Sequence, residues 1–156
     1  MKNQKSKFAF TMIELVFVIV IIGILAAVAV PRLSATRDDA TITKARVLVA
    51  SVRNSLAMER QKRILRGVFT PLTGVGNVTN AFGNFYDVNG DTNTSVLEYP
   101  IKSEANKKDR WSFTENAYTF KSVLGDVVFE VVNGKFECDT NKTSNTNATG
   151  CTQLTN

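Results

Sequence analysis

The feature that most constrains this chain is an uninterrupted apolar run close to its N-terminus. Every residue from 15 to 30 is apolar or glycine, and extending the run back to Phe8 gives 23 residues interrupted only by Thr11 and Glu14. As a helix rising about 1.5 Å per residue, this segment is long enough to cross a bilayer. Residues 1–9 carry three lysines and no acid, so the positive-inside rule predicts a cytoplasmic N-terminus and an exported remainder.

Three ordinary segments share this pattern: a secretory signal peptide, a plain signal anchor and a buried core helix. Ala27 and Ala29 resemble the small residues of a signal-peptidase site, whereas the run is too long and too uniformly apolar for a core helix. Glu14 argues against all three. A carboxylate costs roughly 2.5–3.5 kcal/mol near the bilayer centre and less toward the interface, and no basic residue within the run can pair with it. Glu14 is therefore a functional candidate.

The residues around this acid carry a family resemblance. The stretch KFAFTMIEL, which continues as VFVIVIIGILAAVAVP, resembles the class III signal of type IV prepilins and type II secretion pseudopilins. The resemblance implies that a prepilin peptidase cuts between Ala9 and Phe10 and N-methylates Phe10. It also implies that Glu14 pairs with the N-terminal amine of a neighbouring subunit, which fixes the axial register of a filament. Ala9 departs from the glycine that the family usually has there, so slower cleavage is expected.

Pro31 closes the apolar run, and two outcomes are open for it. Proline removes a backbone hydrogen bond, so it either ends the membrane helix or bends a longer one, which the resemblance implies is part of subunit assembly. Beyond it, apolar residues recur at spacings of three and four, which predicts an amphipathic helix over 32–66 with Gly67 as its stop. These apolar residues are Ile42, Ala45, Val49, Val52 and Leu56.

The C-terminal part of the chain shows short strand patterns separated by turn residues. Strands are expected over 111–113, 117–123, 126–132 and 135–138, and the Asn133-Gly134 pair between the last two is a strong hairpin signal. Residues 67–97, rich in Gly, Asn and Thr, are expected to be loop-like. The sequence therefore predicts an α+β, pilin-like fold in which a long N-terminal helix packs on a small antiparallel meander.

The expected organisation is a basic leader at 1–9, a transmembrane and polymerisation helix at 10–31, an amphipathic helix at 32–66, and a head at 67–156 that ends in a C-terminal loop. Cys138 and Cys151 are the only cysteines. In an exported protein this pair favours a disulfide, which would stabilise by roughly 3 kcal/mol in the chain-entropy estimate. Two free thiols are the alternative. A metal site is poorly supported, since the chain has no histidine.

A second candidate site lies in the polar stretch 87–98. Asp87, Asn89, Asp91 and Glu98 share the oxygen-ligand spacing of a twelve-residue calcium loop, so calcium is a possible cofactor. The sixth position holds Thr92 rather than glycine, and no flanking helix pair is evident. A simple polar turn around Asn89-Gly90 is the alternative.

An enzyme is not expected, because the chain has no histidine and no phosphate-binding glycine motif. The resemblance implies a structural filament subunit of the bacterial inner membrane with a periplasmic head, partnered by the prepilin peptidase, other subunits and an inner-membrane assembly platform. A type II secretion pseudopilin is the first expectation. A competence pseudopilin, a surface pilin and a non-polymerising, signal-anchored binding module are the alternatives.

The distribution of charged residues bears on the alternative that this chain is a competence pseudopilin. Segment 32–66 holds nine basic residues against three acids, whereas 67–156 holds seven against ten. A basic helix face can contact nucleic acid or anionic lipid, but more often it is solvated or pairs with acids on a neighbouring subunit. Direct nucleic-acid binding is therefore possible but not the favoured expectation. The cations concerned are Arg37, Lys44, Arg46, Arg53 and Arg60.

Overall fold

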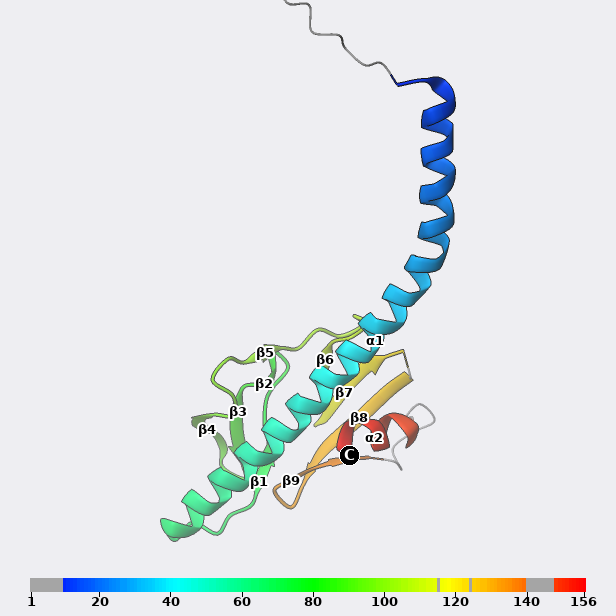
Figure 1. Ribbon diagram of the computed structural model, residues 1–156. Helices are drawn as coiled ribbons and strands as arrows, with labels where there is room; N and C mark the ends of the chain where they lie inside the picture. The colour runs from blue at the N-terminus through cyan, green and yellow to red at the C-terminus, as the bar shows by residue number, and fades with distance from the viewer. Residues whose placement is uncertain (1–9, 115, 124, 140–147) are drawn as a thin grey trace, which may run out of the picture. The chain divides into compact units, whose positions relative to one another are not determined.

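The computed structural model describes residues 10–114, 116–123, 125–139 and 148–156. The chain divides into two compact units, residues up to Arg37 and Asp38–Asn156, and each is described by itself. A single helix, α1 (Met12–Leu65), contributes to both units (Figure 1). The α+β fold predicted from the sequence, a long N-terminal apolar helix with antiparallel sheets, is confirmed.

The first unit is the apolar part of α1. Its most apolar 18-residue window has a mean hydropathy of 3.1, and none of that window is buried inside the protein. Pro31 lies within the helix, so the alternative in which this proline ends the helix is wrong. The turn after it is reinforced by the Thr36 hydroxyl, which donates to the Arg32 carbonyl at 3.0 Å. An apolar helix with no protein covering it requires an apolar environment, either lipid or other helices.

The second unit begins with the amphipathic part of α1. The buried positions follow spacings of four and three without a break, so one face of the helix packs on the sheets. The first four are apolar, as the sequence predicts. The last two, Glu59 and Arg63, are charged. The buried positions are Ala45, Val49, Val52, Leu56, Glu59 and Arg63.

The main sheet is an antiparallel meander with the strand order β6-β7-β8-β9. Its strands are β6 (Trp111–Thr114), β7 (Ala117–Ser122), β8 (Gly125–Val132) and β9 (Lys135–Cys138). Asn133 and Gly134 join β8 to β9 with φ values of 51° and 74°, as a two-residue type I′ turn requires. The turn sets the register, in which Val132 pairs with Lys135.

Two smaller sheets take four of their five strands from residues 67–97, so the expectation that this segment is loop-like was wrong. One has the order β1-β3-β4, from β1 (Leu72–Gly74), β3 (Asn84–Asp87) and β4 (Gly90–Ser95). The other pairs β2 (Asn80–Phe82) with β5 (Ile101–Lys102). The strands are short and interrupted by register shifts, and their side chains are too polar to show a clear alternation.

Aromatic rings fill the core between α1 and these sheets. Phe82 and Tyr118 stack with centroids 5.5 Å apart, and Phe129 stacks on Phe136 at 4.9 Å. The buried Tyr118 hydroxyl accepts a hydrogen bond from the Val75 backbone N–H at 2.8 Å. The core thus ties the irregular segment after α1 to the meander.

The chain ends in a second helix, α2 (Ala148–Thr155), where a loop was expected. Its eight residues include a glycine and three threonines, so intrinsic propensity does not predict a helix. Tertiary contacts hold it instead. Cys151 and Leu154 are buried, and the Arg46 guanidinium donates from Nε to the Gln153 carbonyl at 2.7 Å.

Candidate functional site

The N-terminal site is built on the first turn of α1. The Thr11 carbonyl accepts from the Leu15 N–H at 3.2 Å, and the Thr11 hydroxyl accepts from the Glu14 N–H at 3.3 Å. Thr11 is therefore the helix cap, and Thr-x-x-Glu is the pattern of a capping box. A carboxylate in the first turn also interacts favourably with the helix dipole, so Glu14 suits this position in the isolated chain.

Glu14 and Phe10 are both open to partners. Phe10 is 77% exposed, and Glu14 is exposed with no ion pair to any of the residues that the structure describes. Ala9, on the other side of the expected cut, lies outside the described residues, as does the whole leader 1–9. Within the described part of the chain, an apolar helix thus begins with an acid in its first turn that has no ion-pair partner.

A family model matches this segment. Residues 4–30 match the prokaryotic N-terminal methylation motif. The chain carries the prepilin-type signature of type IV pilins and pseudopilins. The signature covers the apolar segment and not the head. No curated protein and no solved structure matches the chain.

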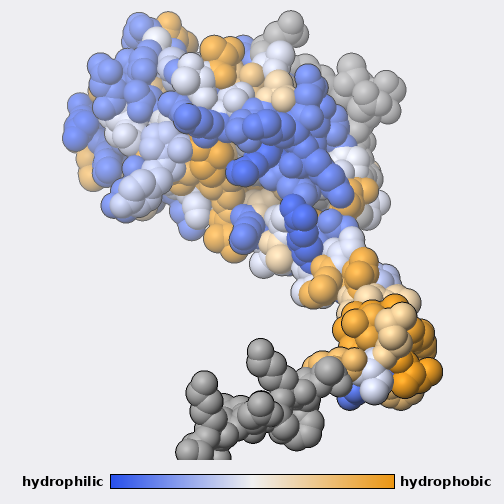
Figure 2. Space-filling view, turned by 90° about the horizontal axis from the view of Figure 1, so that it is seen from above, coloured by the Kyte–Doolittle hydropathy of each residue, from blue (hydrophilic) through white to orange (hydrophobic). Residues whose placement is uncertain are grey.

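The prepilin-type signature gives the N-terminal site its chemistry. It marks a chain that prepilin peptidase processes and that assembles with other pilin-type subunits. Together with α1, which is long and apolar enough to span a bilayer, the signature also indicates a membrane-anchored protein. Figure 2 shows the contrast in surface: orange covers the apolar helix, whereas blue dominates the face of the globular unit that is in view.

Two of the arginines on the basic face of α1 already form hydrogen bonds with the head. Arg46 donates to the Gln153 carbonyl, and Arg53 donates from Nε to the Phe136 carbonyl at 3.0 Å. These two arginines hold α2 and β9 against α1. Lys44 and Arg60 are exposed.

A buried charge cluster, which the sequence reasoning missed, lies at the C-terminal end of α1. Arg63 Nη2 lies 2.9 Å from Asp87 Oδ2, and Arg63 Nε lies 3.5 Å from Glu59 Oε1. The three side chains are only 10%, 11% and 6% exposed, respectively. The sequence did contain an indication that Glu59 and Arg63 are buried, because they continue the three-and-four spacing of the apolar stripe.

Three of the four expected calcium ligands, Asp87, Asn89 and Asp91, lie on the β3–β4 hairpin rather than in a helix-flanked loop, and Glu98 lies beyond the end of β4. Asp87 Oδ1 accepts from the Asn89 N–H at 2.8 Å, and Asp87 Oδ2 is paired with Arg63. The Asn89 hydrogen bond is the main cause that lowers the pKa of Asp87, and Arg63 lowers it further. The Asp87 oxygens are thus already engaged.

Asp91 and Glu98, the other two acids among the expected calcium ligands, do not form a metal-binding cluster either. Asp91 accepts from the Asn93 N–H at 2.8 Å and from the Asn84 side chain at 3.1 Å, which lowers its pKa, and Glu98 is exposed. Among the described residues, no group of three or more acidic, cysteine or histidine side chains is arranged to hold a metal ion. Calcium binding stays a prediction from the sequence that this geometry does not favour.

Cys138 and Cys151 form the disulfide that the sequence predicts, with their Cα atoms 5.8 Å apart. The bond joins the end of β9 to α2. It therefore fixes the C-terminal helix to the meander on both sides of the segment 140–147, which lies outside the described residues.

Proposed function

We propose that this chain is a pseudopilin of a type II secretion system. In this role it is a structural subunit without catalytic activity, and its filament moves folded proteins outward across the cell envelope. The observation that carries the proposal is the prepilin-type signature on an apolar helix that none of the other described residues covers. Burial of many such helices against one another in a filament core would supply the apolar environment that the helix needs.

Glu14 would set the register of that assembly. After removal of residues 1–9, the methylated amine of Phe10 becomes a cation one residue before Thr11, the cap of the helix. A carboxylate inside an apolar bundle is strongly disfavoured unless it is paired. Pairing Glu14 with the amine of a neighbouring subunit satisfies both charges, and any other axial offset leaves both unpaired.

Secretion is preferred to DNA uptake because of how the basic helix is used. Arg46 and Arg53 each donate from Nε to a carbonyl of the head, so these two donors are not available to a phosphate. The head would lie in the periplasm, and the inner-membrane assembly platform would be its partner there.

The test uses Glu14→Gln in the native host, with Glu98→Gln as the matched control at an exposed head position. We expect E14Q to be cleaved and membrane-inserted but absent from sheared filaments, and E98Q to assemble normally. Loss of the gene should leave exported folded proteins in the periplasm. Normal assembly of E14Q would contradict the filament mechanism, and normal secretion with lost DNA uptake would contradict the assignment to secretion.

A further inference from the structure

Two asparagines in the described part of the head begin the acceptor sequence for N-linked glycosylation, which is Asn, any residue except proline, and then Ser or Thr. They are Asn77, followed by Val-Thr, and Asn93, followed by Thr-Ser. Two further copies, at Asn141 and Asn147, begin outside the described residues. Such short sequences also arise by chance in a chain rich in Asn and Thr, so the surroundings of each asparagine decide whether a sugar can be attached.

The Asn77 side chain is already used by the fold. Its Oδ1 accepts from the backbone N–H groups of Thr79 and Asn80 at 2.9 Å each, and its Nδ2 donates to the Tyr86 hydroxyl at 3.1 Å. The residue is half-buried. A sugar joined to Nδ2 would crowd Tyr86, so Asn77 is a poor acceptor.

Asn93 lies in the opposite situation, on strand β4. Its side chain is exposed, and its amide forms no hydrogen bond with any residue that the structure describes. β4 is the last strand in the order β1-β3-β4, so it is an edge strand of its sheet. The Asn93 amide is therefore accessible, and a sugar attached to it would displace no contact of the fold.

A bulge in β4 takes Asn93 out of the regular ladder. Ser95 pairs with Asn84 and Asp91 pairs with Tyr86, so three residues of β4 stand opposite a single residue of β3. Asn93 is the middle residue of these three and adopts a φ of 54°, which asparagine tolerates better than most residues. Its N–H donates to Asp91 Oδ1 at 2.8 Å and closes an Asx turn. The acceptor thus lies in a turn held by the acid two residues before it.

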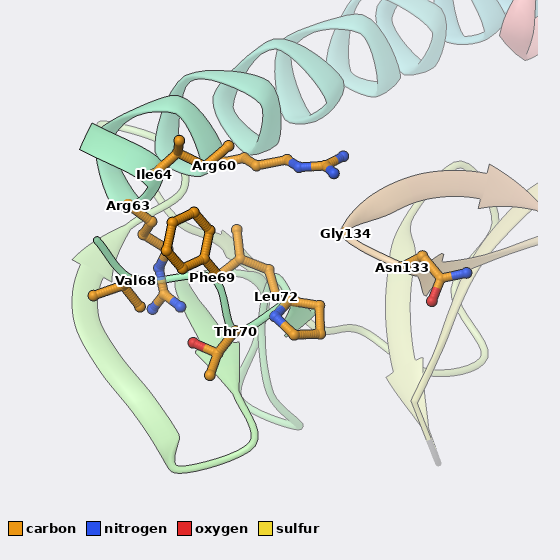
Figure 3. A pocket seen from close by; sticks show the side chains of 10 residues that line it. Arg60, Arg63, Ile64, Val68, Phe69, Thr70, Leu72, Asn133 and Gly134 are labelled. Carbon is orange, nitrogen blue, oxygen red and sulfur yellow. The ribbon is translucent and has the colours of Figure 1, made fainter. Parts of the chain in front are cut away.

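Strand β3, by contrast, is anchored in the head. Arg63 extends from the last turn of α1 (Figure 3) and pairs with Asp87 Oδ2 at 2.9 Å. Phe85 is buried in the core, and its carbonyl accepts from the Thr92 hydroxyl at 2.9 Å. The hairpin is therefore fixed through β3, whereas β4 presents Asn93 to solvent.

We propose that Asn93 is an N-glycosylation site. The proposal rests on export of the head, which is part of the proposed function. The acceptor is presented by a bulge on an edge strand, and Asp91 gives the sequence the acid-extended form of the bacterial acceptor sequence. A bulky, hydrated saccharide at this position also keeps other strands from adding to the edge of the sheet.

The reaction needs a lipid-linked oligosaccharide and a transferase of the cell envelope. The lone pair of Asn93 Nδ2 forms a bond to the anomeric carbon of the sugar. The bond between that carbon and the diphosphate oxygen of the lipid carrier breaks, and its electron pair leaves with the diphosphate. One proton of Nδ2 passes to a base of the transferase, so the side chain stays an amide and gains one saccharide.

The test uses the full-length protein purified from the envelope of its native host. Cleavage after Arg66 and Lys102 releases one peptide that contains both Asn77 and Asn93, so the two acceptor sequences are compared in the same molecule. We expect tandem mass spectra to place a saccharide on Asn93 and none on Asn77. An unmodified Asn93 would overturn the proposal, as would a saccharide on Asn77 alone.

Two variants at one exposed position assign the modification to the acceptor sequence. Ser95→Ala removes the hydroxyl that this sequence requires, whereas Ser95→Thr keeps it. S95A should lose the saccharide from Asn93 completely, and its intact mass should fall by the mass of that saccharide. S95T should keep it. A saccharide retained on Asn93 in S95A would contradict the proposal.

Protease digestion of spheroplasts separates this proposal from the function on which it rests. A head that the protease reaches from outside, but that carries no saccharide on Asn93, overturns the site and leaves the filament role intact. A saccharide on Asn93 in a chain that never enters filaments supports the site and contradicts the filament role.

Discussion

The Tyr118 hydroxyl is the polar link between the core of the meander and the segment after α1. It is 1% exposed and accepts from the Val75 N–H, which is itself on a fully buried residue. Replacing it by phenylalanine keeps the ring stack with Phe82 but leaves that N–H without an acceptor. The free energy of unfolding of Y118F at pH 8 should therefore fall by about 1–3 kcal/mol.

The same hydroxyl predicts a pH dependence with a definite sign. Burial raises the pKa of Tyr118 from 10.0 to about 12, because the folded protein disfavours the phenolate. The unfolded chain thus releases this proton first as the pH rises. The stability is fully present below about pH 10 and is lost progressively between pH 10 and 12, by about 1.4 kcal/mol at pH 11.

The assay is urea unfolding of the full-length protein in nanodiscs, followed by the fluorescence of the single tryptophan, Trp111, which is buried in the core. Wild type and Y118F are compared at pH 8 and pH 11, so that groups common to both cancel. The stability advantage of the wild type should shrink by about 1.4 kcal/mol between these values. An advantage that stays constant would refute the reasoning.

Three further changes test other parts of the head. Cys138→Ser with Cys151→Ser should lower the free energy of unfolding by roughly 3 kcal/mol, and a reducing agent should lower the wild-type melting temperature toward that of the double variant; equal stability would contradict the structural role of the disulfide. Gly76→Ala would drive a Cβ into the Ala81 carbonyl oxygen, so it should cost about 3 kcal/mol or more in the same unfolding assay. An unchanged melting temperature would count against this backbone packing. Arg63→Met leaves the mostly buried carboxylates of Glu59 and Asp87 without their cation and should cost about 3 kcal/mol at pH 7. The cost should shrink at acidic pH as Asp87, whose pKa Arg63 helps to lower, becomes protonated, and a loss that is independent of pH would contradict this cause.

The meander could be predicted from the sequence because its signals are local. Val127, Phe129 and Val131 alternate along β8, and the Asn133-Gly134 pair adopts the positive φ values that its turn requires. The apolar stripe of α1 was likewise readable from spacing alone. In both cases the secondary structure is set by residues that are close together in the sequence.

What the sequence could not give depends on partners far along the chain. The predicted apolar stripe contains no residue beyond Leu56, and charged residues such as Arg63 usually face water. Arg63 is buried because Asp87, on β3, lies beside it. Strand β4 has no apolar residue to reveal it. Helix α2 has weak propensity and depends on the disulfide at Cys151.

The N-terminal site was also only partly predictable from the sequence. Glu14 is conspicuous in sequence because its charge interrupts an apolar run, and the family match bears out the signature around it. The role of Thr11 as a cap was visible as Thr-x-x-Glu and was overlooked. The proposed partner of Glu14, the N-terminal amine of a neighbouring subunit, belongs to another molecule, so the sequence of one chain does not place it.

The most direct test of the central claim is the intact mass of the protein extracted from the membranes of its native host. The account predicts a chain that begins at Phe10 and carries one added methyl group. An unprocessed chain, or one cut after Ala29, would contradict it.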